Sequence, residues 1–213
     1  MGLDFVNIAL GKGRIAKKSI ELLEKIGITF EDYSDESRKL IFENKKDKVR
    51  LVFVKAVDVP VYVERGAADI GVVGKDTLLE ENKDLYEILD LNFGKCKFSV
   101  AAPNGYKYTG GNKLKVATKY PNVAKMHFSK KGEDIDIIKL NGSVELAPLV
   151  GLSDVIVDIV ETGTTLKENG LVVIEDICPV SARMVVNKAS FKVKNEKIEE
   201  IIDKTRILIK EGI

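Results

Sequence analysis

The stretch Val155-Ile-Val-Asp-Ile-Val-Glu-Thr-Gly-Thr-Thr-Leu166 joins an apolar run to two carboxylates and then to a cluster of threonine and glycine. The run from Val155 to Val157 is rich in β-branched residues, which is typical of a buried strand in a parallel sheet. We expect Asp158 to emerge near the carboxyl end of that strand, where open α/β sheets bind their ligands. The threonine and glycine cluster is expected to open a short helix. This order of elements predicts an α/β fold with a ligand site at the edge of a sheet.

The polar residues after the strand suit a phosphorylated sugar. Asp158 and Glu161 are able to accept hydrogen bonds from ribose hydroxyls. The next four residues supply backbone N–H groups and hydroxyls at a helix N-terminus, where unpaired donors and the helix dipole favour a phosphate. They are Thr162, Gly163, Thr164 and Thr165. Asp158 could instead be a strand-end carboxylate that caps a neighbouring helix, but that interpretation leaves Glu161 and the threonines unexplained.

Short apolar strands alternate with helical segments along the rest of the chain, which is the pattern of an α/β protein. The expected strands are 5–10, 49–54, 70–73, 100–102, 116–118 and 135–140, and the expected helices are 14–26, 57–65, 75–81, 123–131, 144–150 and 196–210. The alternation restarts after Phe93, so we expect two lobes. Residues 1–93 with 180–213 are expected to form lobe I, and residues 94–179 to form lobe II.

The turn Gly11-Lys-Gly-Arg14 has the character of an anion site, because its glycines free the backbone while Lys12 and Arg14 carry charge between a strand and a helix. Its spacing is not that of a Walker A loop. Short glycine turns are common in α/β proteins, so the turn taken alone is more often a plain connection.

A second turn of this kind is Gly142-Ser-Val-Glu145. Ser143 is expected to be the N-cap of the following helix, and Gly142 is expected to allow a close approach of the backbone. The same alternative applies here, since such a turn is also a common connection.

Composition sets limits on the function. The 213 residues include 34 Lys and Arg against 33 Asp and Glu, a net charge of +1, so no overall charge attracts nucleic acid or an anionic membrane. We find no leader pattern and no run of membrane-spanning length, and expect a cytoplasmic protein. Cys96 and Cys178 form no CxxC motif and are expected to be buried thiols in a reducing compartment, not a disulfide. The single histidine, His127, rules out a histidine-rich metal site.

Six motifs follow one another along nearly the whole chain. They are Gly11-Lys-Gly-Arg14, Asp58-Val-Pro-Val-Tyr-Val-Glu64, Ala68-Asp-Ile-Gly-Val-Val-Gly-Lys-Asp76, Ala117-Thr-Lys-Tyr-Pro-Asn122, Gly142-Ser-Val-Glu-Leu-Ala-Pro148 and Asp158-Ile-Val-Glu-Thr-Gly-Thr-Thr-Leu-Lys-Glu-Asn-Gly-Leu171. Together they resemble the ATP phosphoribosyltransferase family. Lys55 stands where members often carry Arg, which keeps the charge but loses the bidentate geometry of a guanidinium on phosphate.

The resemblance implies a two-lobed fold like that of type II periplasmic binding proteins, with the active site in the interlobe cleft. It implies transfer of the phosphoribosyl group of phosphoribosyl pyrophosphate to N1 of the ATP adenine, which gives phosphoribosyl-ATP and pyrophosphate and opens histidine biosynthesis. Mg²⁺ is expected to be bound mainly through the substrates. The length is similar to that of the short form, whose catalytic subunit joins a histidyl-tRNA-synthetase-like regulatory subunit in a hetero-oligomer.

The resemblance also assigns roles to residues. The expected catalytic residues are Asp158, Glu161, Arg14 and Lys12. The expected phosphoribosyl pyrophosphate loop is Thr162, Gly163, Thr164 and Thr165. The other residues expected to line the cleft are Gly11, Gly13, Lys55, Gly142, Ser143 and Glu145.

Two other functions are compatible with the residues. The same two-lobed architecture serves proteins that capture small solutes, because fold alone does not fix function. A different phosphoribosyltransferase, such as one that acts on free nucleobases, is a second alternative, since the order Asp-x-x-Glu-Thr-Gly-x-Thr also fits its sugar-phosphate loop.

Overall fold

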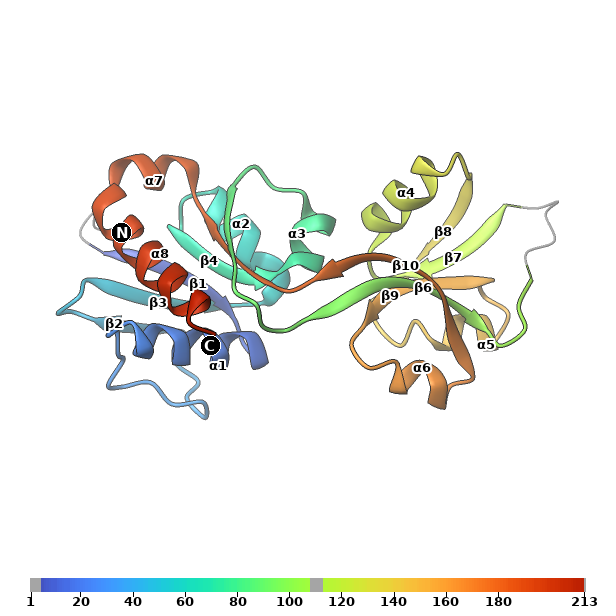
Figure 1. The fold of residues 1–213 in the computed structure, drawn as a ribbon, viewed down its shortest axis with the longest axis horizontal. Helices are drawn as coiled ribbons and strands as arrows, with labels where there is room; N and C mark the ends of the chain where they lie inside the picture. The colour runs from blue at the N-terminus through green and yellow to red at the C-terminus, as the bar shows by residue number, and fades with distance from the viewer. Residues whose placement is uncertain (1–4, 108–112, 213) are drawn as a thin grey trace. The chain divides into compact units, whose positions relative to one another are not determined.

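The computed structural model describes residues 5–107 and 113–212. The chain divides into two compact units, and it passes between them twice. Unit 1 comprises Met1–Gly94 and Ser181–Ile213, and unit 2 comprises Lys95–Val180. The colours of Figure 1 show that unit 1 is built from both ends of the chain and unit 2 from its middle.

Unit 1 contains a six-stranded sheet in the order β2-β3-β1-β4-β11-β5. The strands are β1 (Val6–Gly11), β2 (Ile41–Asn44), β3 (Val49–Val54), β4 (Ile70–Gly74), β5 (Tyr86–Asp90) and β11 (Ala182–Val186). The central strand β1 runs parallel to β3 and β4, whereas β11 is antiparallel to both β4 and β5. All residues of β1 and β4 are buried, as is usual for strands covered on both faces.

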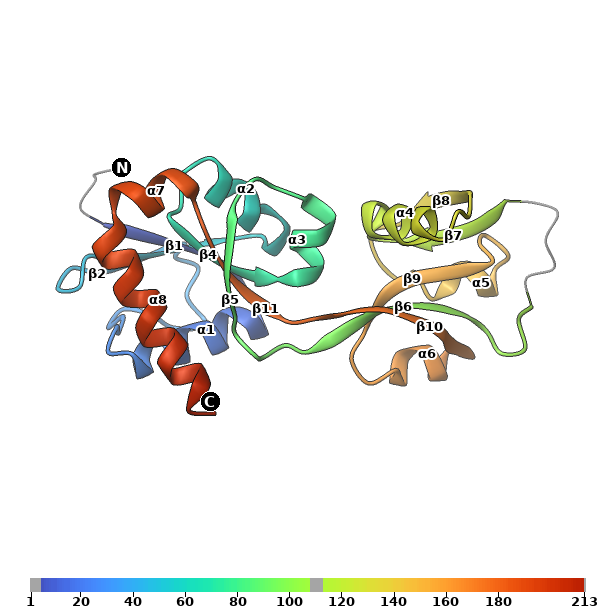
Figure 2. The same cartoon turned by 45° about the horizontal axis from the view of Figure 1, so that its top comes forward.

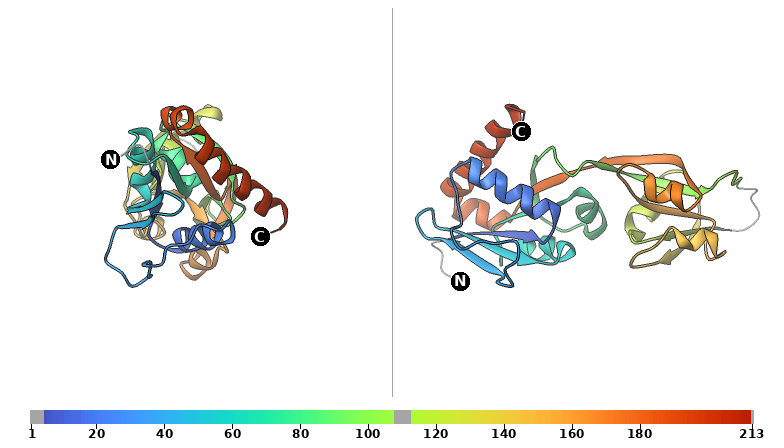
Figure 3. Two further views of the ribbon diagram at one scale, coloured as in Figure 1. Left: turned by 90° about the vertical axis from the view of Figure 1, so that its left-hand side faces the viewer. Right: turned by 90° about the horizontal axis from the view of Figure 1, so that it is seen from below.

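Helices cover both faces of this sheet. They are α1 (Arg14–Lys25), α2 (Val59–Glu64), α3 (Lys75–Glu81), α7 (Lys188–Val193) and α8 (Asn195–Lys210), with a 3₁₀ turn η1 (Ala56–Asp58) before α2. Ile20 of α1 and Ile201 of α8 belong to one core cluster with Ile8 of β1, whereas Val63 of α2 belongs to a second cluster with Ala9 of β1. Neighbouring residues of a strand point to opposite faces, so α1 and α8 lie on one face and α2 on the other (Figure 3).

Unit 2 contains a five-stranded sheet in the order β10-β6-β9-β7-β8. The strands are β6 (Cys96–Pro103), β7 (Leu114–Thr118), β8 (Ile135–Lys139), β9 (Val155–Val160) and β10 (Leu171–Val180), and the helices are α4 (Pro121–Lys130), α5 (Leu146–Leu149) and α6 (Thr164–Glu168). β7 is parallel to β8 and β9, while β6 is antiparallel to β9 and β10. In Figure 2, α4 lies on one side of the sheet and α6 on the other.

Most of the expected elements are confirmed, but several differ in extent or kind. The strand expected at 100–102 extends over Cys96–Pro103. The helix expected at 57–65 begins as the 3₁₀ turn η1 and becomes α-helical only at Val59. The helix expected at 144–150 is shortened to Leu146–Leu149. The strands β2, β5, β10 and β11 and the helix α7 were not expected, because they are short or lack a regular alternation of apolar residues. No helix in the described ranges is long and apolar enough to cross a membrane. Cys96 and Cys178 are both half-buried, so the expectation of buried thiols is wrong.

Candidate functional site

Residues 155–166 form the strand β9, a turn and the first residues of α6 in unit 2 (Figure 1). Asp158 lies in the carboxyl-terminal half of β9, opposite Ser99 of β6, as expected, although the strand continues for two more residues. The strand is longer than its buried apolar run because Ile159 and Val160 still pair with β6. Asp158 is half-buried, and its Oδ1 accepts a hydrogen bond from the Ile159 N–H at 2.8 Å.

The turn after β9 opens α6 in the expected way. Gly163 occupies the N-cap position with φ 77°, a left-handed conformation that glycine adopts without the strain that a Cβ would add. The Thr162 hydroxyl lies 3.0 Å from the Thr164 hydroxyl and accepts a weak hydrogen bond from the Thr164 N–H at 3.4 Å. Glu161 and Thr165 are exposed beside them. The turn thus presents a carboxylate, three hydroxyls and the first N–H groups of a helix to solvent.

The Gly142–Glu145 turn differs from its prediction. Ser143 has φ 49° and is not the N-cap, because α5 begins only at Leu146 and Glu145 directly precedes it. The Ser143 carbonyl instead accepts a hydrogen bond from the Leu146 N–H at 3.2 Å. Gly142 has open space where a Cβ would stand, so the structure shows no close backbone approach there.

The two turns of unit 2 share one edge of the sheet. The Gly142–Glu145 turn follows β8, and the turn from Glu161 follows β9; both strands run parallel to β7, so their carboxyl ends lie at the same edge. Val144 and Leu166 are buried in one cluster with Ile156, which ties both turns to the same sheet face. The predicted residues of unit 2 are therefore brought together.

In unit 1, the predicted residues lie at the carboxyl end of β1. Gly11 is the last residue of β1 and is buried; a Cβ on it would stand 2.6 Å from the Ala56 Cα and 2.7 Å from the Ala56 Cβ. Lys12 and Gly13 form the turn, Gly13 has φ 123°, and α1 begins at Arg14. Close packing therefore requires a glycine at position 11, and the backbone conformation requires one at position 13.

Lys55 lies beside this turn. Gly11 pairs with Val54 in the parallel register of β1 and β3, so Lys55 is the residue that follows the partner of Gly11. Its side chain is exposed, and its carbonyl accepts the Asp58 N–H at 2.9 Å as η1 begins. Lys12, Arg14 and Lys55 thus bring three cationic groups to the ends of two adjacent strands.

A pocket of about 300 Å³ opens beside Lys12 and Arg14. The segment after α1 supplies its other wall, and the Lys12 Nζ donates to the Ser37 carbonyl at 3.4 Å. Its aromatic residues pack together: the ring centroids of Tyr33 and Phe42 lie 5.3 Å apart, and those of Phe42 and Phe53 lie 5.7 Å apart. The pocket therefore joins the basic turn after β1 to the segment that follows α1.

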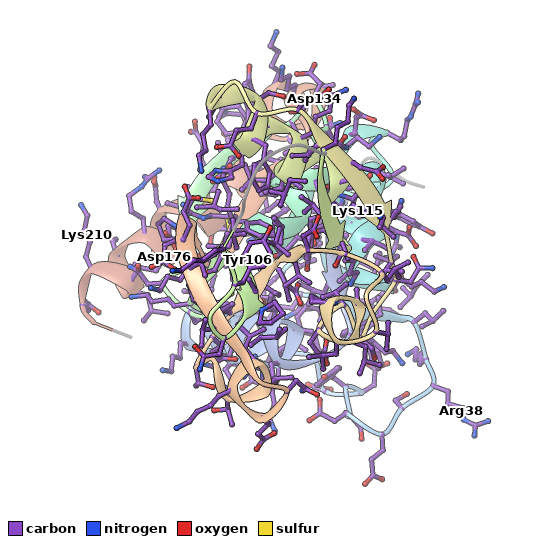
Figure 4. All side chains as sticks on the ribbon, turned by 90° about the vertical axis from the view of Figure 1, so that its right-hand side faces the viewer. Arg38, Tyr106, Lys115, Asp134, Asp176 and Lys210 are labelled. Atoms are coloured by element: carbon purple, nitrogen blue, oxygen red, sulfur yellow. The ribbon has the colours of Figure 1, made fainter. Side chains whose placement is uncertain are left out.

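Sequence reasoning missed the segment 33–39 as part of this pocket. Tyr33 donates its hydroxyl to Asp35 at 2.5 Å, and burial together with that carboxylate raises the pKa of Tyr33 to about 12, so the phenol stays neutral. Lys39 lines the pocket and pairs with Asp32. The neighbouring Arg38 extends away from the ribbon (Figure 4). The consecutive basic residues 38 and 39 were the available signal, but only the fold places Lys39 in one pocket with Lys12.

The described residues contain no group of three or more His, Cys, Asp and Glu side chains that could hold a metal ion.

Comparison with known proteins decides the family. A model of the HisG family, ATP phosphoribosyltransferase, matches residues 55–206. The chain is 57% identical over 207 residues to the ATP phosphoribosyltransferase of Clostridium kluyveri, covering 97% of this chain and 94% of that protein. It is 58% identical over 214 residues to that of Lachnoclostridium phytofermentans, covering 99% and 100%. The chain belongs to the ATP phosphoribosyltransferase family.

Solved structures agree with this result. A HisG:HisZ complex of ATP phosphoribosyltransferase from Thermotoga maritima contains a chain that is 38% identical, with a TM-score of 0.85, over 97% of this chain and 98% of that chain. The periplasmic VFT2 domain of BvgS from Bordetella pertussis is 11% identical with a TM-score of 0.59 over 96% and 87%, which shows likeness of fold alone. The predicted two-lobed fold of the type II periplasmic binding proteins is confirmed.

Family membership also confirms the predicted class of enzyme. The chain is a pentosyltransferase, an ATP phosphoribosyltransferase of the first step of histidine biosynthesis. The family model and the relatives that are 57–58% identical favour this activity over a role as a solute-binding protein.

Proposed function

We propose that the chain is a catalytic subunit that transfers the phosphoribosyl group of phosphoribosyl pyrophosphate to N1 of the ATP adenine, giving phosphoribosyl-ATP and pyrophosphate. The observation that carries the proposal is the β9–α6 turn, which presents carboxylates and helix N-terminal donors side by side. The family assignment supports the reaction, and the turn supports the place where the sugar phosphate binds.

The 5′-phosphate binds at residues Thr162 to Thr165. The left-handed Gly163 turns the backbone into α6, so that the N–H groups of the first helical turn are directed at an incoming anion. The hydroxyls of Thr162 and Thr164 lie 3.0 Å apart and add donors on the same side. No cation is needed in this loop, because the helix terminus itself favours negative charge.

The ribose hydroxyls donate to Asp158 and Glu161. Asp158 already accepts the Ile159 N–H through Oδ1, which fixes its carboxylate in β9. Glu161 follows the end of β9 and is exposed. Two carboxylates so close to the phosphate loop would hold the sugar ring at two points.

Pyrophosphate binds to the cationic groups of unit 1. Lys12, Arg14 and Lys55 lie at the ends of β1 and β3, and the pocket beside Lys12 has room for part of a nucleotide. The guanidinium of Arg14 suits bidentate contacts with phosphate oxygens, and the two lysines add point charges. In unit 2, Gly142, Ser143 and Glu145 contact the substrate from the sheet edge that they share with the β9–α6 turn.

Positioning and electrostatics supply most of the rate acceleration. The N1 lone pair attacks C1 of the ribose while the bond from C1 to the pyrophosphate oxygen breaks, and pyrophosphate leaves with that electron pair. The ribose gains oxocarbenium character in this step, so no protein nucleophile is required. The protein has to align N1 with C1 and to stabilise the charge of the departing pyrophosphate.

Mg²⁺ accompanies the substrates. It usually keeps several waters and binds through one or two carboxylates together with substrate phosphates, which fits a chain whose described residues offer no cluster of three acidic or imidazole ligands. When bound, the ion neutralises charge on the pyrophosphate.

The chain acts as a short-form subunit with a histidyl-tRNA-synthetase-like regulatory partner, in the cytoplasm. The Thermotoga maritima relative forms a HisG:HisZ complex, and its chain is covered over 98% of its length by this one. That likeness supports a hetero-oligomer of the same kind.

The test is pyrophosphate release by the purified chain with ATP, phosphoribosyl pyrophosphate and Mg²⁺, with and without a regulatory partner from the same source. Glu161→Gln should abolish most of the release, whereas Glu168→Gln, an exposed carboxylate on α6, should leave it unchanged. Release that requires ATP and the partner supports the whole proposal. Release of pyrophosphate without the partner would contradict the dependence on a regulatory subunit. Release with a free nucleobase in place of ATP would contradict ATP as the acceptor of the phosphoribosyl group.

A further inference from the structure

The motif Ala117-Thr-Lys-Tyr-Pro-Asn122 has no role in the proposed reaction, although it begins at the sheet edge that binds the substrate. Thr118 is the last residue of β7, the strand that lies between β8 and β9. Because β7 runs parallel to both neighbours, Thr118 lies at the edge that carries the Gly142–Glu145 turn and the β9–α6 turn. Its side chain is fully buried, so it faces the protein and not the solvent.

The hydroxyl of Thr118 joins β7 to β9. Its Oγ1 donates a hydrogen bond to the Val157 carbonyl at 2.6 Å and accepts one from the Tyr120 N–H at 2.8 Å. A buried hydroxyl that both donates and accepts has a fixed orientation. The ring of Tyr120 packs edge-on against that of Phe98, with 4.9 Å between the centroids, so the residue that donates to Oγ1 is itself held in the core.

The position of Asp158 depends on this bond. Val157 directly precedes Asp158, and the register of β7 with β9 ends at the pair of Thr118 and Val157. From Asp158 to Val160, β9 is paired with β6 alone among the described strands. Without the hydroxyl of Thr118, the segment that carries Asp158 into the β9–α6 turn would be held from one side.

The backbone of Thr118 holds the other turn of this edge. Its carbonyl accepts a hydrogen bond from the Leu140 N–H at 3.0 Å. Leu140 follows β8, lies two residues before Gly142 and packs against the cluster that buries Val144 and Leu166. A single buried residue therefore bonds to the base of each turn to which we assign substrate contacts.

We propose that Thr118 is a positioning residue for the sugar phosphate. Its hydroxyl fixes the end of β9, so that Asp158 and the turn that ends at Thr165 keep the spacing that the ribose and the 5′-phosphate require. The inference rests on the proposed function, from which it takes these substrate contacts. Thr118 acts through Val157 and does not touch the substrate. A displacement of about 1 Å in a substrate-positioning group is able to lower a rate about 10²-fold, so one buried hydrogen bond has a measurable effect.

The test compares two substitutions of Thr118. Thr118→Val keeps the shape of the side chain and deletes the hydroxyl, which leaves the Val157 carbonyl and the Tyr120 N–H without this partner. We expect the affinity for phosphoribosyl pyrophosphate, measured by calorimetry with Mg²⁺, to fall about tenfold and kcat to fall about 10- to 100-fold, with the KM for ATP unchanged. Thr118→Ser keeps the hydroxyl and should restore both quantities.

Val116→Ala is the control for stability. Val116 is buried in the same strand, two residues before Thr118, and its truncation leaves a cavity. Both Val116→Ala and Thr118→Val should lower the urea midpoint of unfolding, but only Thr118→Val should weaken the binding of phosphoribosyl pyrophosphate. Amide hydrogen exchange adds a readout that needs no activity: Thr118→Val should accelerate exchange specifically at residues 158–165, and Val116→Ala should not single out these residues.

Two results would overturn the inference. One is that Thr118→Val binds phosphoribosyl pyrophosphate and turns over like the wild type. The other is that Thr118→Val and Val116→Ala lose binding equally and Thr118→Ser restores nothing, which would show a purely structural role. Failure of the proposed function is distinguishable, because Asp158→Asn would then bind phosphoribosyl pyrophosphate as tightly as the wild type. If Asp158→Asn weakens binding and Thr118→Val does not, the positioning role alone is refuted.

Discussion

The close packing of Gly11 against Ala56 gives the sharpest prediction. In Gly11→Ala, the new Cβ would stand 2.6 Å from the Ala56 Cα, 2.7 Å from its Cβ and 3.0 Å from its nitrogen. Carbon atoms in contact prefer about 3.5–4.0 Å, so β1 and η1 must separate by roughly 1 Å. Overpacking of a core costs about 1–3 kcal/mol, and we expect about 2–3 kcal/mol because the atoms that clash are backbone atoms.

Urea unfolding followed by circular dichroism measures this cost. The matched control is Gly142→Ala, where a Cβ meets open space, and it should change the free energy of unfolding by less than about 0.5 kcal/mol. Ala56→Gly in the Gly11→Ala background removes the contact with the Ala56 Cβ but not that with its Cα, so it should restore only part of the loss. The same separation shifts Lys12 and should weaken binding of anionic substrates.

Two results would refute this reasoning. Gly11→Ala could be as stable as the control, which would mean that η1 moves away without cost. The double variant could recover fully, which would mean that the backbone of Ala56 is not the obstacle.

Three further predictions concern unit 2. Asp158→Asn and Glu161→Gln should each lower turnover by about 10²-fold while changing the free energy of unfolding by less than about 0.5 kcal/mol; wild-type turnover in both would remove the ribose role. Thr165→Val should raise the KM for phosphoribosyl pyrophosphate about tenfold and leave that for ATP unchanged, because it deletes a hydrogen bond to a charged group; equal effects on both substrates would contradict the phosphate loop. A hydrogen bond from Lys131 lowers the pKa of Glu175 in the folded chain below its value in the unfolded chain. The ion pair therefore stabilises the fold at pH values above the unfolded pKa, and this stabilisation is lost as the pH falls through the folded pKa. Glu175→Gln should therefore cost less than about 1 kcal/mol at pH 7 and nothing at acidic pH, and an equal cost in urea unfolding at both would argue against the ion pair.

Local patterns in the sequence were sufficient for the elements near the sugar-phosphate turn. Val155 to Val157 predicted a buried strand because β-branched residues in an apolar run favour one. The cluster of threonines around Gly163 predicted a helix start, and α6 begins there, with Gly163 in the left-handed conformation at its N-cap. These features depend on residues within one or two turns of one another, which a sequence displays directly.

The edge strand β10 illustrates what a sequence hides. Its apolar residues 172–174 are exposed and its pairing is interrupted, so it shows no alternation of buried and exposed residues. Ser143 is similar: its left-handed backbone is imposed by the turn between β8 and α5, whereas its residue type favours an N-cap.

The α/β class, the order of the principal elements and the polar residues of each turn could all be inferred from the amino-acid sequence. Tertiary structure alone decided which turns share a sheet edge, that Gly11 must lack a side chain to pass Ala56, that a pocket joins Lys12 to the segment 33–39, and that Thr118 bonds to both Val157 and Leu140. The physical reason is the range of the interactions. Propensity and periodicity act between residues that are close along the chain, while strand register and packing join residues that are dozens of positions apart.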